Sequence, residues 1–260
     1  MKGKYIVITG ASGGLGASIA YECAKQGGNV VLLARNKEKL QAIQQDLHEK
    51  YKIKVQIYSV DVTNINEVEN IFSLIRQELP AIDVLVNNAG YGVFDDADEA
   101  QFEDIKGMFD LNVLGLISCT KQVLPLMKQR RGGQIINIAS QAGKLATPKS
   151  SAYAATKHAV LGYTNALRLE LKPFDVKVMA VNPGPIATNF FDVADRNGNY
   201  LKSVEKWMLK PEVVAGKIVY YMFTNKREIN LPNWMNVISK VYTIMPSVVE
   251  KLGGKSFYQK

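Results

Sequence analysis

Cysteine and histidine are scarce in this chain of 260 residues. Its two cysteines, Cys23 and Cys119, both lie in segments with a helical pattern, which argues against a disulfide framework and favours a reducing, cytoplasmic compartment. Histidine occurs only twice, and there is no Cys-x-x-Cys pair. The sequence therefore predicts no metal site.

Long hydrophobic runs are also missing. No stretch approaches the roughly 18 apolar residues of a membrane-spanning helix, and the apolar run Tyr5–Ile8 is too short for a signal peptide. The net charge of +8 raises the question of nucleic-acid binding. Most basic residues, however, alternate with acidic ones, as in Arg35–Lys52, so we expect solvated helix surfaces and no nucleic-acid partner.

Apolar runs rich in β-formers alternate along the chain with segments of helical periodicity. This alternation predicts right-handed βαβ units and a parallel sheet, and the nearly continuous apolar strands predict helices on both faces. We predict one α/β domain over residues 1–260, of the doubly wound Rossmann type, with a mostly parallel sheet of about seven strands. The predicted strands are Tyr5–Thr9, Val30–Ala34, Val55–Val60, Val84–Asn87, Gln134–Ser140 and Val176–Asn182, and the predicted helices are Leu15–Lys25, Lys37–Lys50, Glu67–Gln77, Asp104–Arg130 and Tyr153–Leu171.

The first predicted strand runs into a glycine-rich turn at Gly10, Gly13, Gly14 and Gly16, and a helix follows at once. Glycines allow a tight turn and a close backbone approach to a pyrophosphate, while the helix N-terminus offers free N–H groups to the phosphates. The turn therefore predicts a dinucleotide site, since it opens the first βαβ unit where that site belongs.

The end of the second predicted strand indicates which nicotinamide cofactor is used. An acidic residue at this place would bind a ribose 2′-hydroxyl, but the sequence has Ala34-Arg35-Asn36. The Arg35 guanidinium can pair with a 2′-phosphate that a carboxylate would repel. We therefore predict a preference for NADP(H).

Tyr153 and Lys157 form a Tyr-x-x-x-Lys pattern on a predicted helix. Residues four apart lie on one helical face, so the two side chains are neighbours. A lysine ammonium close to a tyrosine favours the phenolate and makes the tyrosine a better proton donor and acceptor near neutral pH. Both residue types are common in helices, so the pattern alone is weak evidence for a catalytic role.

The glycine-rich turn and the Tyr-x-x-x-Lys pattern, with several other segments between Lys4 and about Thr188, resemble those of the short-chain dehydrogenase/reductase family. The resemblance implies hydride transfer between NADP(H) and a carbonyl or alcohol, with Tyr153 as the acid/base. It implies that Ser140 holds the substrate carbonyl, that Lys157 binds the nicotinamide ribose, and that Asn112 supports a proton-relay water. The catalytic residues implied are thus Asn112, Ser140, Tyr153 and Lys157.

The resemblance also assigns cofactor contacts beyond the glycine turn. Asp61-Val62 corresponds to an adenine-contacting pair, Asn88-Ala89-Gly90 to a segment beneath the cofactor, and the Pro-Gly segment to the nicotinamide carboxamide site. The full predicted set is Gly10, Ser12, Gly13, Gly14, Leu15, Gly16, Arg35, Asn36, Asp61, Val62, Asn88, Ala89, Gly90, Tyr153, Lys157, Pro183, Gly184, Ile186 and Thr188.

Aromatic residues crowd the segment after Thr188, which in this family covers the substrate. We predict a lid over residues 189–210 and an apolar pocket that favours a hydrophobic carbonyl or alcohol. Simple packing of these aromatics on the domain is the alternative. The predicted substrate contacts are Val93, Phe94, Gln141, Ala142, Leu145, Phe190, Phe191 and Trp207.

The C-terminal tail, residues 232–260, has apolar residues at helical spacing together with lysines. Such a segment can rest on a membrane surface, form a subunit interface, or pack on its own domain. The family resemblance further implies a homodimer or homotetramer. Two other functions stay open at this stage: a non-catalytic NADP-binding regulator on the same fold, and a membrane- or partner-docking protein that acts through its tail.

Overall fold

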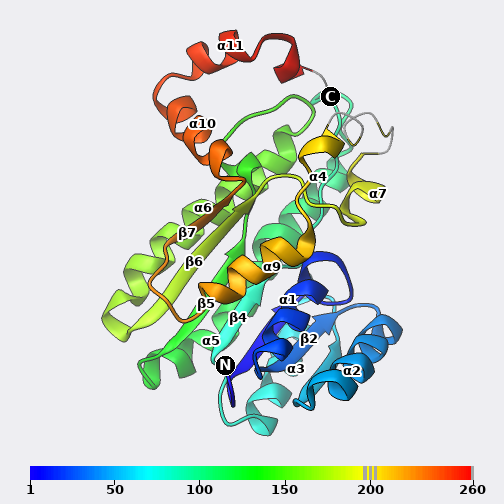
Figure 1. Ribbon diagram of the computed structural model, residues 1–260, viewed down its shortest axis with the longest axis vertical. Helices are drawn as coiled ribbons and strands as arrows, with labels where there is room; N and C mark the ends of the chain where they lie inside the picture. Colours follow the sequence, from blue (N-terminus) through cyan, green and yellow to red (C-terminus); the bar gives the residue numbers. More distant parts are fainter. Residues whose placement is uncertain (196–197, 199–200, 202–203, 259–260) are drawn as a thin grey trace.

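The computed structural model describes residues 1–195, 198, 201 and 204–258, with side chains described as far as Leu252. Seven strands form one parallel sheet in the order β3-β2-β1-β4-β5-β6-β7 (Figure 1). The predicted Rossmann-type architecture is confirmed. The strands are β1 (Tyr5–Thr9), β2 (Asn29–Ala34), β3 (Val55–Ser59), β4 (Val84–Asn87), β5 (Gly133–Ile138), β6 (Val176–Pro183) and β7 (Glu228–Leu231).

Helices cover both faces of the sheet (Figure 1). One layer contains α1 (Gly14–Lys25), α2 (Lys37–Tyr51) and α9 (Pro211–Tyr220), and the other contains α3 (Ile65–Glu78), α5 (Leu116–Gln129) and α6 (Ser151–Leu171). Four further helices lie outside these two layers: α4 (Phe102–Phe109), α7 (Phe190–Ala194), α10 (Asn233–Ile244) and α11 (Pro246–Tyr258).

The sheet separates two hydrophobic cores. In β1, Ile6 and Ile8 pack under the α1–α9 layer, while Val7 between them packs under the α3–α6 layer. All three are fully buried because successive side chains point to opposite faces and helices cover both. This explains why the strands read as continuous apolar runs.

The predicted helix Asp104–Arg130 is interrupted in the structure. It consists of α4, a π-helical turn at Asp110–Gly115, and α5. The turn packs tightly at Gly115, where an added Cβ would lie 2.9 Å from the carbonyl oxygen of Val62. Turns of this kind inside helices often mark functional sites, because the extra residue redirects the neighbouring side chains. Helix α9 was not predicted.

The strand order reverses between β1 and β4, which are neighbours in the sheet although two strands separate them in the chain. In an open α/β sheet this reversal leaves a crevice at the carboxyl ends of the strands, where ligands bind. No helix in the described part of the chain has both the length and the apolar character needed to cross a bilayer.

Candidate active site

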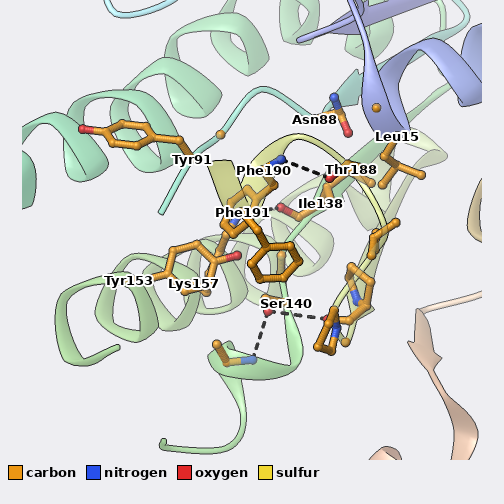
Figure 2. A pocket seen from close by; sticks show the side chains of 18 of the residues that line it. Leu15, Asn88, Tyr91, Ile138, Ser140, Tyr153, Lys157, Thr188, Phe190 and Phe191 are labelled. Atoms are coloured by element: carbon orange, nitrogen blue, oxygen red, sulfur yellow. Dashed lines mark hydrogen bonds between the residues drawn. The ribbon is translucent and has the colours of Figure 1, made fainter. Parts of the chain in front are cut away.

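A cavity of about 500 Å³ lies at this carboxyl edge. Its wall is drawn from the glycine turn after β1, the segment after β4, the end of β5, helix α6, the segment after β6, and the first turn of α10. Figure 2 shows Tyr153 and Lys157 projecting from α6 on the same side of this pocket, with Ser140 at its floor. The chain thus brings residues from both of its ends to one site.

The glycine turn forms one end of the cavity. Gly10 adopts a φ of +66°, and an added Cβ there would lie 2.9 Å from Ala89 Cα. A Cβ at Gly16 would overlap the carbonyl oxygen of Gly10. Gly13 differs, since a Cβ there would meet nothing within 4 Å, and this residue lines the cavity. The backbone is therefore tightly packed at Gly10 and Gly16, whereas Gly13 faces the space that a ligand would occupy.

Helix α1 starts at this open turn. Its N-terminus has no side-chain cap and no acidic residue in its first turn. The first amides of a helix have no partner within the helix, so these N–H groups and the positive end of the helix dipole are available to an anion. The residues present therefore fit the pyrophosphate of a dinucleotide.

Thr9 and Asn88 lock the glycine turn to the segment that follows β4. The Thr9 hydroxyl accepts hydrogen bonds from the backbone N–H groups of Asn88 and Ala89, both at 3.0 Å. The Asn88 side chain donates to the carbonyls of Thr9, at 3.0 Å, and Gly10, at 3.2 Å. This reciprocal set fixes two chain segments that lie far apart in sequence.

Two cations stand at the end of β2. Arg35 is exposed and lies outside the cavity wall, whereas Lys39, one helical turn later, lines the cavity. The Asn36 side chain caps α2 by accepting from the backbone N–H of Lys39 at 2.8 Å. A nearby pair, Asp61 and Val62, also lies outside the wall. The Asp61 carboxylate accepts from Thr63, and Val62 is buried.

Lys157 is buried below Tyr153 on α6. Its Nζ lies 5.6 Å from the centre of the Tyr153 ring and donates to the carbonyl of Ile138 at 3.1 Å. Burial lowers the pKa of Lys157 to about 8, because the ammonium loses hydration that one carbonyl does not replace. The protonated fraction of Lys157 therefore changes with pH close to neutrality.

Ser140 directly follows β5 and caps a short 3-10 turn at Gln141–Gly143. Its hydroxyl oxygen accepts a hydrogen bond from the backbone N–H of Ala142 at 3.1 Å, and the hydroxyl donates one to the carbonyl of Pro183 at 3.5 Å. Figure 2 shows both of these interactions. They hold the hydroxyl on the cavity wall.

Asn112 lies in the π-helical turn and is almost fully buried. Its side-chain amide donates to the Tyr91 carbonyl at 2.8 Å and to the Thr156 hydroxyl at 3.1 Å, and its oxygen accepts from the Tyr91 N–H at 3.0 Å. Asn112 thereby connects the segment after β4 to α6, on which Tyr153 and Lys157 stand.

Aromatic rings form the apolar wall beside Tyr153. The centres of the Phe94 and Phe190 rings each lie 5.7 Å from that of Tyr153, and Phe191 lies 5.4 Å from Phe190. The N–H of Phe94 donates to the carbonyl of Ala194 at 2.9 Å, which ties α7 to this wall. Residues 196–197, 199–200 and 202–203 of the predicted lid lie outside the described residues.

Most of the predicted site residues meet at the cavity, but some do not. Those on the wall are Gly10, Ser12, Gly13, Gly14, Leu15, Asn88, Ala89, Gly90, Phe94, Ser140, Gln141, Ala142, Leu145, Tyr153, Lys157, Pro183, Gly184, Ile186, Thr188, Phe190 and Phe191. The residues off the wall are Gly16, Arg35, Asn36, Asp61, Val62, Val93, Asn112 and Trp207. Trp207 instead contacts Trp234, with ring centres 6.0 Å apart.

Lys39 and Met235 line the cavity although the sequence did not single them out. The signal for Lys39 was its place in the first turn of the helix that follows Arg35. Met235 falls outside the apolar stripe of the tail, so its spacing gave no signal.

Comparisons with family models and with curated proteins agree on one family. A family model described as short chain dehydrogenase matches residues 4–198. The chain is 35% identical to mouse 3-ketodihydrosphingosine reductase over 84% of its own length and 68% of that protein. It is 32% identical to the NADP-dependent 3-hydroxy acid dehydrogenase of Schizosaccharomyces pombe, over 88% of its length and 90% of that protein.

A solved structure extends the similarity to three dimensions. It is a short-chain dehydrogenase from Sphingobium yanoikuyae in complex with NADPH, which superposes with a TM-score of 0.82 at 27% identity. The match covers 94% of this chain and 95% of the other. The similarity therefore includes most of the elements that surround the cavity.

Proposed function

This chain belongs to the short-chain dehydrogenase/reductase family, and we propose that it transfers a hydride between NADP(H) and an apolar carbonyl or alcohol, with Tyr153 as the acid/base. The observation that carries the proposal is the grouping of Ser140, Tyr153 and Lys157 on the wall of the cavity that the glycine turn also lines. Proton-transfer groups and a phosphate site thus face the same space.

The chain's own residues perform the proton chemistry. When bound, the cofactor supplies the hydride. The Ser140 and Tyr153 hydroxyls hydrogen-bond the substrate oxygen, on which negative charge grows during reduction, and Tyr153 delivers its proton to that oxygen. The Lys157 ammonium favours the phenolate that remains. Asn112 holds α6 against the segment after β4 and so keeps these groups in register.

The preference for NADP(H) over NAD(H) rests on charge at the end of β2. Arg35 and Lys39 are both cationic, and the residues between β2 and α2 include no carboxylate. A 2′-phosphate would be paired there, while a bare ribose hydroxyl would not need either cation. The cofactor in the names of the fission yeast relative and the Sphingobium structure agrees with this assignment.

The aromatic wall and the names of the relatives support a substrate class. Phe94, Phe190 and Phe191 present apolar surface next to Tyr153, which suits a hydrocarbon chain beside the reacting carbon. Two relatives are named for a 3-keto and a 3-hydroxy compound. We therefore assign an apolar 3-oxo or 3-hydroxy compound as the substrate.

The active form is proposed to be a homo-oligomer in a reducing compartment, as the sequence predicts. Phe102, Leu114 and Leu169 are exposed on α4, the π-helical turn and α6, the helices expected to form the interface. A second copy would cover these apolar side chains. Both cysteines are free and buried.

The test is oxidation of NADPH, followed by absorbance, with a panel of aliphatic ketones, aldehydes and 3-oxo esters. Turnover of apolar 3-oxo compounds by the unmodified protein, and its loss in Tyr153→Phe, are the expected results. NADPH binding without turnover of any panel member would instead favour the non-catalytic regulator.

A further inference from the structure

Apolar side chains are unusually exposed on α10 and α11. Val237, Ile244 and Leu252 are 62%, 80% and 83% exposed. Trp234, Val241, Met245 and Val248 are also exposed on the same two helices. We call these seven residues the tail surface. Monomeric soluble proteins seldom expose so many neighbouring large apolar residues, so a partner is expected to cover them.

The tail surface lies among positive charges. Lys240 and Lys251 are exposed within it. Residues 233–260 contain four lysines and one glutamate, with no aspartate or arginine, which gives this segment a net charge of +3. Helices that combine exposed apolar residues with lysines lie at the interface of bilayers that contain anionic lipids.

Both tryptophans of the chain belong to this region. Trp207 is 63% exposed and contacts Trp234 edge to face, with ring centres 6.0 Å apart. Tryptophan is enriched at the level of lipid headgroups, because its ring is apolar and its N–H remains hydrated. The pair connects the tail surface on α10 to Trp207 in the predicted lid segment.

The tail surface borders the cavity. Met235, beside Trp234 in the first turn of α10, lines the cavity, and its sulfur lies where an added Cβ at Gly184 would meet it, at 3.0 Å. Figure 1 shows α10 and α11 standing beyond the carboxyl edge of the sheet, away from both helix layers. One end of α10 is thus in the cavity wall, while Val237, Val241 and Ile244 of the same helix face outwards.

We infer that α10 and α11 dock on an anionic lipid bilayer and place the cavity entrance next to its surface. A second copy of the chain is the competing occupant. In a twofold interface the same surface of both copies meets, so Lys240 and Lys251 of one copy would lie close to the same lysines of the other. Like charges disfavour that pairing, whereas anionic headgroups neutralise them.

Docking also supplies a route for the substrate, and this step rests on the proposed function. An apolar 3-oxo compound with a long hydrocarbon chain partitions into bilayers. In the docked state it would enter on the side of the cavity that Met235 lines. The substrate class is thereby narrowed to membrane-dissolved amphiphiles.

The experiment uses the full chain and vesicles of phosphatidylcholine, with or without phosphatidylglycerol. Because the only tryptophans are Trp207 and Trp234, intrinsic tryptophan fluorescence reports on this region directly. We expect a blue shift with anionic vesicles, co-flotation of the protein with them, and release at high salt. An unshifted spectrum with no flotation would overturn the proposal.

Matched variants test whether vesicle binding depends on the tail surface itself or only on the total charge and exposed apolar area of the protein. Lys240→Gln with Lys251→Gln is expected to lower the vesicle partition coefficient about thirtyfold, whereas Lys25→Gln with Lys54→Gln removes the same charge elsewhere and should leave it unchanged. Ile244→Ser with Leu252→Ser is expected to lower it at least about tenfold. Ile65→Ser with Tyr220→Ser, which removes exposed apolar side chains elsewhere on the surface, serves as its control.

Other outcomes would decide against lipid. If the tail variants dissociate an oligomer in light scattering while vesicles have no effect on the unmodified protein, a second copy covers the tail surface. Reduction of soluble 3-oxo compounds without vesicle binding would refute docking and leave the proposed function intact. Vesicle binding without any NADPH turnover would refute the proposed function alone.

Discussion

The Lys157 ammonium lies 5.6 Å from the centre of the Tyr153 ring, and its described hydrogen bond is to the carbonyl of Ile138. The two side chains share one face of α6, and Lys157 is buried. A buried cation is costly for the fold, since it gives up hydration. Its place beside the tyrosine supports the proposed role in proton transfer.

Tyr153→Phe removes one oxygen and leaves the ring that packs against Phe94 and Phe190. We expect turnover to fall by about two to four orders of magnitude, since the proton donor is lost. NADPH binding, measured by fluorescence titration, should stay within a factor of about two, because the phosphate site is separate. Tyr220→Phe on the exposed face of α9 is the matched control, and it should retain full activity.

The pH dependence of kcat/KM should follow Lys157. Because burial lowers its pKa to about 8, the ammonium is present below that pH and is lost above it. We expect kcat/KM to fall as the pH rises through about 8, since kcat/KM reports groups of the free enzyme. Lys157→Met should be inactive over the whole range. A flat profile up to pH 10 would contradict this assignment of the cation.

The stability of the protein should change in the opposite sense to its activity. The pKa of Lys157 is lower in the folded protein than its ordinary value of 10.5, so unfolding binds a proton between about pH 8 and 10.5. The contribution of Lys157 therefore destabilises the fold at neutral pH, and this cost is removed as the pH rises. Lys157→Met should unfold at an equal or higher denaturant concentration than the unmodified protein at pH 7.

Arg35→Asp should reverse the cofactor preference. A charged hydrogen bond is worth about 1.5–3 kcal/mol, which corresponds to a preference of roughly ten- to a hundredfold for NADPH in kcat/KM. Lys39→Gln should raise the KM for NADPH and leave that for NADH unchanged, because Lys39 lines the cavity. Lys37→Gln, in the first turn of the same helix, is its control. Equal use of both cofactors by the unmodified protein would refute the 2′-phosphate site.

Gly16→Ala and Gly216→Ala should have opposite effects on stability. A Cβ at Gly16 overlaps the backbone carbonyl oxygen of Gly10, so we expect a loss of about 1–3 kcal/mol in the free energy of unfolding, together with weaker NADPH binding. A Cβ at Gly216 in α9 meets nothing within 4 Å. That substitution should stabilise the protein by about 0.5–1 kcal/mol, as measured by urea unfolding.

Asn112→Ala removes three hydrogen bonds from a buried site and leaves the Tyr91 backbone with no partner from this side chain. We expect a loss of about 1–3 kcal/mol in stability per buried group left unsatisfied. Turnover should fall further than the folded fraction does, because α6 is no longer held to the segment after β4. Asn70→Ala, on the exposed surface of α3, should change neither quantity.

The strands of this fold could be predicted closely because both faces of the sheet are buried. β1 and β4 have the predicted bounds, and the other predicted strands differ by one or two residues at their ends. The interruption of Asp104–Arg130 could not be predicted, since its cause is tertiary: Asn112 and Gly115 contact the segment after β4 and Val62. The apolar periodicity of a single helix does not depend on such contacts and so cannot reveal them.

Parts of the site were equally dependent on tertiary contacts. Tyr153 and Lys157 follow from helical spacing, whereas Ser140 needs the end of β5 to meet that helix, which only the family resemblance indicated. Met235 could not be found, because its contact with the Gly184 region depends on the path of the chain after β7. Arg35 was the clearer sequence signal at the end of β2, yet Lys39 is the cation on the cavity wall.

The participation of Met235 in the cavity wall has a consequence for biosynthesis. Gly10 and Met235 lie on the same wall, so all residues from Gly10 to Met235 must leave the ribosome before the cavity is complete. The first βαβ units are able to form earlier, because their contacts are local. A stalled nascent chain would therefore complete the cavity wall only after the first turn of α10 has emerged, and truncations that stop before α10 would leave the pocket open on that side.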